Sequence, residues 1–115
     1  MIKNISSNKI LANKTNLCTN IFSKAKGLMF SKKIEDRGLV FIFKKDRIWS
    51  LHMLFVFFPI DVLWLNKDYK IVDMKENFAP FSLLAKPKEK SRFVVELPAG
   101  AIKNSDTIVG DKISF

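Results

Sequence analysis

The chain has 115 residues, of which 48% are hydrophobic and 27% are charged, and its formal net charge at pH 7 is +9. This composition excludes a disordered chain, and the length is sufficient for one domain with a hydrophobic core but too short for two, so we predict a single domain over residues 1–115. The positive charge raises nucleic acid or an anionic membrane surface as partners, although net charge alone identifies neither.

The N-terminal part of the chain predicts one strand and the only helix. Residues 9–15 are predicted as a strand, and Thr19 is placed to cap a short helix over residues 20–28. No long apolar stretch typical of a secretory signal precedes them. Cys18 is the only cysteine, so no disulfide can form within the chain, which fits a reducing compartment. We therefore expect a cytoplasmic protein.

The rest of the chain consists of short runs of β-branched and aromatic residues separated by turn residues. These runs predict strands at residues 38–43, 48–57, 61–65, 70–75, 91–97 and 112–115. Residues 44–47 form a predicted charged turn, and residues 76–90 form a long connection interrupted by two prolines. Several short strands with one short α-helix predict a mainly β fold, either a compact small barrel or a sandwich.

The most apolar segment, residues 48–65, has the length of a membrane-spanning helix. Pro59 and Asp61 interrupt it, and its residues are mostly β-branched or aromatic. We therefore predict two buried strands and no transmembrane segment.

Five motifs follow one another in the order and at the spacing of a known family. They are Gly27–Phe30, Gly38–Phe41, His52–Asp61, Glu96–Gly100 and Gly110–Asp111. With these motifs the chain resembles the uncharacterised family called domain of unknown function 192, and the His-Met and Phe-Pro-Ile-Asp version is similar to that of archaeal members. The resemblance implies a small, mostly β domain and no particular activity. In the turn after the Pro-Ile-Asp strand, Asp68 or Tyr69 replaces a glycine that is usual in the family.

Two polar residues bound the apolar run in the middle of the chain. His52, the only histidine, lies at one end and Asp61 at the other. If the chain turns at residues 58–59, the two side chains share a face but are about 13 Å apart, too far for a catalytic dyad. Because Asp61 has only apolar neighbours in sequence, we expect its oxygens to accept backbone N–H bonds and hold the turn after Pro59. The functional alternatives are the polar floor of a ligand pocket, or a general acid or base.

Glu96 is the third candidate for a pocket. Alternation places it on the face of its strand opposite Phe93, Val95 and Leu97. The default interpretation is a solvent-facing glutamate paired with a lysine or arginine. If the sheet curls so that this face meets Asp61, two carboxylates share a cleft, as a small hydrolase requires. No zinc-ligand spacing is present, so we predict no metal and no cofactor, and leave open whether the protein is an enzyme.

Four cations occupy alternate positions late in the chain, namely Lys86, Lys88, Lys90 and Arg92. In an extended chain they would project from one side over about 20 Å, as a candidate anion-binding stripe. Such a stripe could follow a phosphate backbone or lie on anionic lipid, and the alternative is an edge strand protected from aggregation by lysines. No aromatic residues alternate with these cations, so the stacking half of a single-strand site is missing.

The leading hypothesis is a non-catalytic binding or interaction module with a pocket near His52, Asp61 and Glu96. Its partner would be a small ligand or another protein. The alternatives are a small hydrolase that uses paired carboxylates, and a binder of nucleic acid or an anionic surface through the basic stripe.

Overall fold

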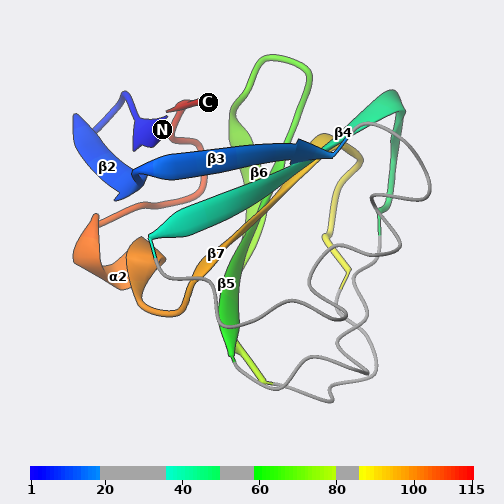
Figure 1. Cartoon of the computed structure of the whole chain (residues 1–115). Coiled ribbons are helices and arrows are strands. Elements are labelled where there is room, and N and C mark those ends of the chain that lie inside the picture. The colour runs from blue at the N-terminus through cyan, green and yellow to red at the C-terminus, as the bar shows by residue number, and fades with distance from the viewer. Residues whose placement is uncertain (19–35, 50–58, 80–85) are drawn as a thin grey trace.

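The structure of the protein is a computed structural model that describes residues 1–18, 36–49, 59–79 and 86–115. The described residues form eight strands and one short helix, in chain order β1 (Ile2–Asn4), β2 (Lys9–Ala12), β3 (Lys14–Cys18), β4 (Arg37–Arg47), β5 (Ile60–Leu65), β6 (Ile71–Phe78), β7 (Ser91–Pro98), α2 (Ala101–Asn104) and β8 (Ile113–Ser114). Five strands form one sheet in the order β3-β4-β7-β5-β6, and three form a second sheet in the order β2-β1-β8. The fold is therefore mostly β and sandwich-like, not a closed barrel (Figure 1).

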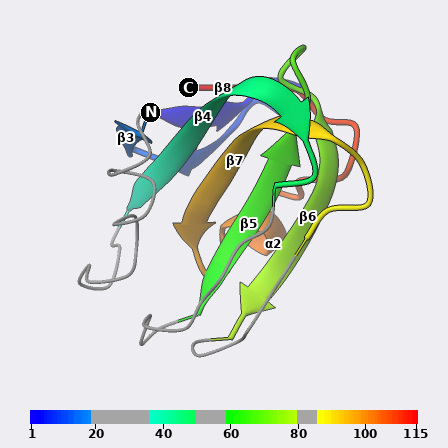
Figure 2. The same ribbon diagram turned by 90° about the vertical axis from the view of Figure 1, so that its right-hand side faces the viewer.

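One hydrophobic core lies between the two sheets. The small sheet contributes Ile2, Leu11, Ala12 and Ile113, α2 contributes Ile102, and the large sheet contributes Val40, Leu63, Leu65, Ile71, Phe93, Val95 and Leu97. The large-sheet residues alternate along their strands, because successive side chains of a strand point to opposite faces. Figure 2 shows the small sheet and α2 lying on one side of the large sheet.

The opposite face of the large sheet carries a second buried cluster. Its members are Cys18, Leu39, Phe41, Ile60, Val62, Trp64, Phe78 and Val94, and we call this side the outer face. In β5 all six residues are buried. A strand that is covered on both faces has no solvent side for a polar residue, so the carboxylates of β5 and β7 are enclosed.

Three sequence predictions about strands need correction. Residues 76–78, predicted as the start of a long connection, belong to β6. The predicted strand 9–15 is two strands, because the chain leaves the small sheet at Asn13 and continues as β3 beside β4 in the large sheet. The predicted charged turn 44–47 belongs to β4. This part of β4 is nevertheless irregular. Ile42 pairs with Phe93 and Arg47 pairs with Ser91, so an advance of five residues along β4 matches an advance of only two along β7. The three additional residues form a bulge, which re-aims side chains.

Several predictions fall on residues outside the described part of the chain. These are the helix at 20–28, His52 and most of the strand at 48–57. The helix of the described part, α2, follows β7 and is not among the sequence predictions. No helix in the four described segments is long and apolar enough to span a membrane.

The turn between β5 and β6 contains Asp68 and Tyr69, one of which stands where the resemblance implies a glycine. Asn66 Oδ1 accepts the backbone N–H groups of Asp68 and Lys70, and Tyr69 adopts a left-handed φ of 65°. The Tyr69 ring stacks on Phe93 with centroids 5.0 Å apart. Packing of the ring thus accompanies a backbone conformation that glycine adopts more easily.

Candidate functional site

Asp61 is fully buried in β5, with 0% of its surface exposed. Its Oδ1 accepts the backbone N–H of Asn77 at 3.0 Å, and its Oδ2 accepts those of Gly100 at 3.1 Å and Ile102 at 2.9 Å. The expectation that Asp61 accepts backbone N–H bonds is confirmed. The donors come from β6 and the start of α2, however, and not from the turn after Pro59.

These donors belong to backbone that deviates from regular structure. Asn77 has a φ of 48° and lies where the register of β5 and β6 shifts. Gly100 precedes the first residue of α2 and has no side chain with which to cap it. The first N–H groups of a helix lack intrahelical acceptors, and a carboxylate is a favourable partner for them. Asp61 therefore joins β5 to two irregular segments, and both of its oxygens are occupied.

Glu96 is also buried, with 2% of its surface exposed, so the default prediction of a solvent-facing glutamate is wrong. Its neighbours on the adjoining strands are Leu39 of β4 and Val62 of β5. Its Oε2 has no hydrogen-bond partner among the described residues. Burial raises the pKa of the Glu96 carboxyl from 4.5 to about 8, so the group is mainly protonated at neutral pH.

The two carboxylates lie on opposite faces of the large sheet. The antiparallel register pairs Asp61 with Leu97 and Val62 with Glu96. Directly opposite residues share a face and successive residues alternate, so Asp61 points towards the core between the sheets and Glu96 towards the outer face. The structure therefore does not bring together the pair of carboxylates that the hydrolase alternative requires.

The third candidate for the pocket, His52, lies outside the described residues, so its position relative to Glu96 stays a prediction. Within the described segments, no group of three or more His, Cys, Asp or Glu residues is arranged to hold a metal ion.

The predicted basic stripe is bent. Its residues are Lys86, Lys88, Lys90 and Arg92. β7 begins only at Ser91, and the chain bends at residues 88–89, so the four side chains do not lie along one extended strand. The three lysines are exposed, whereas Arg92 is half-buried and its Nε donates to Asp46 Oδ1 at 2.8 Å. Anion binding at these residues stays a prediction.

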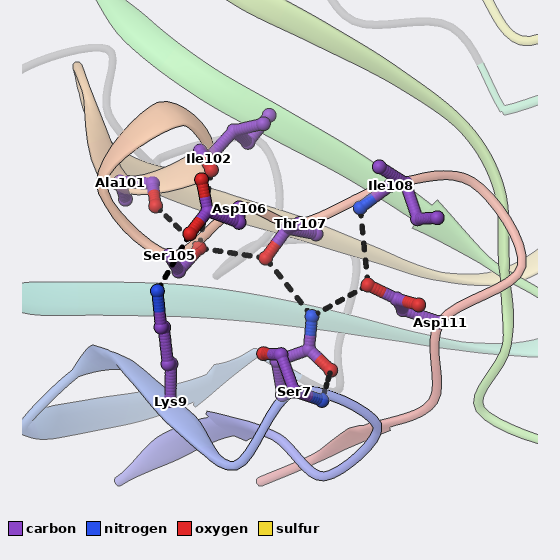
Figure 3. A network of polar contacts seen from close by, with 10 residues as sticks. Ser7, Lys9, Ala101, Ile102, Ser105, Asp106, Thr107, Ile108 and Asp111 are labelled. Carbon is purple, nitrogen blue, oxygen red and sulfur yellow. Dashed lines mark hydrogen bonds and ion pairs between the residues drawn. The ribbon is translucent and has the colours of Figure 1, made fainter.

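A buried polar network that the sequence analysis does not single out joins the small sheet to the segment after α2 (Figure 3). Asn4 is 0% exposed, and its Nδ2 donates to Thr107 Oγ1 at 3.0 Å and to Asp111 Oδ2 at 2.8 Å. Its Oδ1 accepts two backbone N–H groups of the following turn. Thr107 Oγ1 lies 2.6 Å from Ser105 Oγ. Because the Asn4 amide is bonded through both its oxygen and its nitrogen, we interpret the network as structural.

The family model DUF192, described as "Uncharacterized ACR", matches residues 2–115. The chain belongs to the DUF192 family. Its curated relatives include UPF0127 protein TK1120 of Thermococcus kodakarensis, which is 32% identical over 117 residues covering 100% of this chain and 73% of that protein. UPF0127 protein PH1112 of Pyrococcus horikoshii is also 32% identical over 117 residues, covering 100% of this chain and 98% of that protein. The resemblance to the archaeal members of this family is thereby confirmed.

Two solved structures have the same fold. A Sinorhizobium meliloti protein, described as "a putative transcription regulator", is 27% identical with a TM-score of 0.82, covering 87% of this chain and 79% of that chain. A Novosphingobium aromaticivorans protein of unknown function is 20% identical with a TM-score of 0.82, covering 88% of this chain and 74% of that chain. The second likeness concerns the fold alone. Membership of DUF192 thus accounts for the architecture and assigns no chemistry to Asp61 or Glu96.

Proposed function

We propose that this member of DUF192 is a non-catalytic binding domain, and that Glu96 anchors a small ligand on the outer face of the large sheet. The observation that carries the proposal is the buried carboxyl of Glu96, whose Oε2 has no partner among the described residues. Of the residues of the predicted pocket, the proposed site retains Glu96. It excludes Asp61, because backbone amides occupy both oxygens of that residue.

The energetics of Glu96 favour a functional role. A buried polar group without a partner destabilises the folded state by about 1–3 kcal/mol, a large share of the roughly 5–15 kcal/mol that stabilises a domain. The side chain lies between Leu39 and Val62, where an apolar residue of similar size would avoid this penalty. A group that opposes folding and carries a perturbed pKa is typical of a functional site.

The geometry supports binding more than catalysis. A paired-carboxylate reaction needs two carboxyl groups facing one substrate, and the second candidate, Asp61, is on the other face of the sheet. The description of the Sinorhizobium meliloti relative as "a putative transcription regulator" also names a role that rests on binding. We take this as support for the class of function and not for a particular ligand.

The surroundings of Glu96 define the chemistry of the ligand. A protonated carboxyl offers one O–H donor and one carbonyl acceptor, which complements an amide, a carboxylic acid or a similar paired group. On the same face, Phe41 lies two residues beyond Leu39 in β4, and Trp64 lies two residues beyond Val62 in β5. We expect a small molecule with an apolar body and one polar group that pairs with Glu96.

The test is a thermal-shift screen of small amides and carboxylic acids against the wild type, Glu96→Gln and Glu96→Met. Compounds that raise the Tm of the wild type should bind Glu96→Met at least about tenfold more weakly, a loss of about 1.4 kcal/mol. NMR shift changes on binding should centre on Val62 and Val94. Glu76→Gln, at an exposed position of β6, is the matched control and should bind like the wild type. Hits that bind Glu96→Met as well as the wild type would refute the proposal.

A further inference from the structure

The large sheet brings two basic segments together. Residues 44–47 lie at the end of β4 and residues 86–92 lead into β7, and we call the two segments together the basic corner. They are adjacent because Arg47 pairs with Ser91 in the ladder between the two strands. Figure 2 shows the end of β4 beside the start of β7. Seven cations and two carboxylates in these eleven residues leave five of the nine net positive charges of the chain in this corner.

Most cations of the corner project into solvent. The side chains of Lys44, Lys45 and Arg47 are exposed in and beside the β4 bulge, as are those of Lys86, Lys88 and Lys90. Within the described segments, the only cation of the corner in an ion pair is Arg92, which bonds Asp46 and so ties the two segments to each other.

The carboxylates beside the corner are largely engaged. Asp46 is the partner of Arg92, and Asp73 of β6 accepts the backbone N–H of Lys88 at 2.9 Å. Glu89 is the remaining acid of the two segments. The exposed lysines and Arg47 are therefore in excess over the acids near them, as a polyanion site requires.

The structure adds aromatic rings that the spacing of the stripe does not reveal. Phe43 and Trp49 stack with centroids 3.8 Å apart and an interplanar angle of 11°. The guanidinium carbon of Arg47 lies 5.9 Å from the centroid of the Trp49 ring, and Trp49 Nε1 donates to the carbonyl of Lys45 at 3.2 Å. These contacts hold a planar cation beside an aromatic ring in the middle of the basic corner.

We propose that the basic corner binds single-stranded nucleic acid, with the lysines of both segments contacting phosphates and Arg47 stacking on a base. Phosphate contacts from lysines and base stacking on aromatic or guanidinium planes are the two components of such sites. An anionic membrane surface fits less well, because the only large apolar residue of the corner and its described flank that is strongly exposed is Ile48, at 43%.

The lysines of this site lie away from Glu96. Ser91, which pairs with Arg47, and Glu96 are five residues apart in β7, or about 16 Å along the strand. The corner adjoins the outer face at one point, because Trp64 Nε1 donates to the carbonyl of Trp49 at 2.8 Å. The two proposals are tested separately, since substitutions at Lys88 and Lys90 leave Glu96 and Trp64 unchanged.

The test is fluorescence anisotropy of labelled polyuridylate and poly(dT) strands, titrated with the full chain between about 50 and 300 mM KCl. If about four phosphates are contacted, a plot of the logarithm of the binding constant against the logarithm of the salt concentration should have a slope of about −3. Lys88→Glu combined with Lys90→Glu should weaken binding at least about tenfold and reduce the slope to about −1.4. Arg47→Lys keeps the positive charge but removes the planar guanidinium group that stacks on a base. It should weaken binding about threefold and leave the salt slope of the binding constant unchanged.

The matched control is Lys67→Glu combined with Lys103→Glu. Both lysines are exposed and lie outside the corner, and the double change alters the net charge by the same amount. It should weaken binding about twofold or less, and circular dichroism should show that both double variants are folded. Equal losses for the two pairs, absence of binding to either strand, or binding only to vesicles that contain phosphatidylserine would each overturn the proposal.

Discussion

Burial of Glu96 makes the stability of the protein depend on pH. In the folded state its pKa is about 8, whereas in the unfolded chain the carboxyl has its ordinary value of 4.5. Between these pH values the folded state holds one proton more than the unfolded state, so the free energy of unfolding decreases as the pH rises. The slope is about 1.4 kcal/mol per pH unit. The stability that the folded state gains from the raised pKa of Glu96 is fully present below pH 4.5, and it is lost as the pH rises through about 8.

Urea unfolding of the wild type and of Glu96→Gln isolates this effect, because glutamine does not titrate. The stability of the variant relative to the wild type should be greater at about pH 8 than at about pH 5 by about 3–4 kcal/mol. Other carboxylates titrate in both proteins and cancel in the difference. Glu76→Gln, the exposed control, reports the effect of removing one surface carboxylate. A difference between wild type and Glu96→Gln that stays constant from pH 5 to pH 8 would refute the reasoning, because the carboxyl would then have a partner that stabilises its charged form.

Two further predictions concern the packing around the core. Asp61→Asn leaves an NH₂ group facing backbone donors, so it should lower the free energy of unfolding by about 3 kcal/mol in urea titrations, while Asp68→Asn in the exposed turn should change it little. Equal effects at both positions would contradict the structural role of Asp61. In Gly38→Ala the new Cβ would clash with Ile2 Cδ1 and lie 3.2 Å from Leu97 Cδ2, which should destabilise the fold by about 1–3 kcal/mol. Ile2→Val removes that Cδ1, so the double variant should be more stable than the sum of the single effects, and strict additivity would count against the clash.

Periodicity in the sequence is sufficient to predict β5, β7 and the first half of β4, but not β3. In β7, Phe93, Val95 and Leu97 alternate with Val94 and Glu96, and the structure has the two sets on opposite faces. Such a pattern is a local property, because the side chains of a strand alternate whatever its neighbours are. The location of the strand at the centre of a sheet is not local. The solvent-facing interpretation of Glu96 fails because the outer face is itself buried, with Leu39 of β4 and Val62 of β5 on either side of Glu96.

Contacts between distant parts of the chain are beyond the reach of sequence patterns. Asp61 bonds Ile102, which lies 41 positions away, and Asn4 bonds Asp111, which lies 107 positions away. In sequence, Asn4 resembles any polar residue of a short terminal strand, because nothing near it signals a buried partner. Phe43 and Trp49 are close in sequence to Lys44 and Lys45, but only the pairing of Arg47 with Ser91 brings this aromatic pair near the lysines that precede β7.

The two buried carboxylates differ in the sign of their effect on folding, and that difference separates a structural residue from a candidate for function. Asp61 accepts three backbone N–H bonds, so its replacement leaves donors unpaired and destabilises the fold. Glu96 accepts none at Oε2, so its replacement by a residue of similar size should stabilise the fold at neutral pH. The two residues differ by one position in the ladder between β5 and β7, because Asp61 pairs with Leu97 and Glu96 pairs with Val62. Asp61 therefore points towards the backbone at the start of α2, and Glu96 points towards the apolar outer face. Since folding alone disfavours Glu96, the chemistry of this domain is best sought on the outer face of the large sheet.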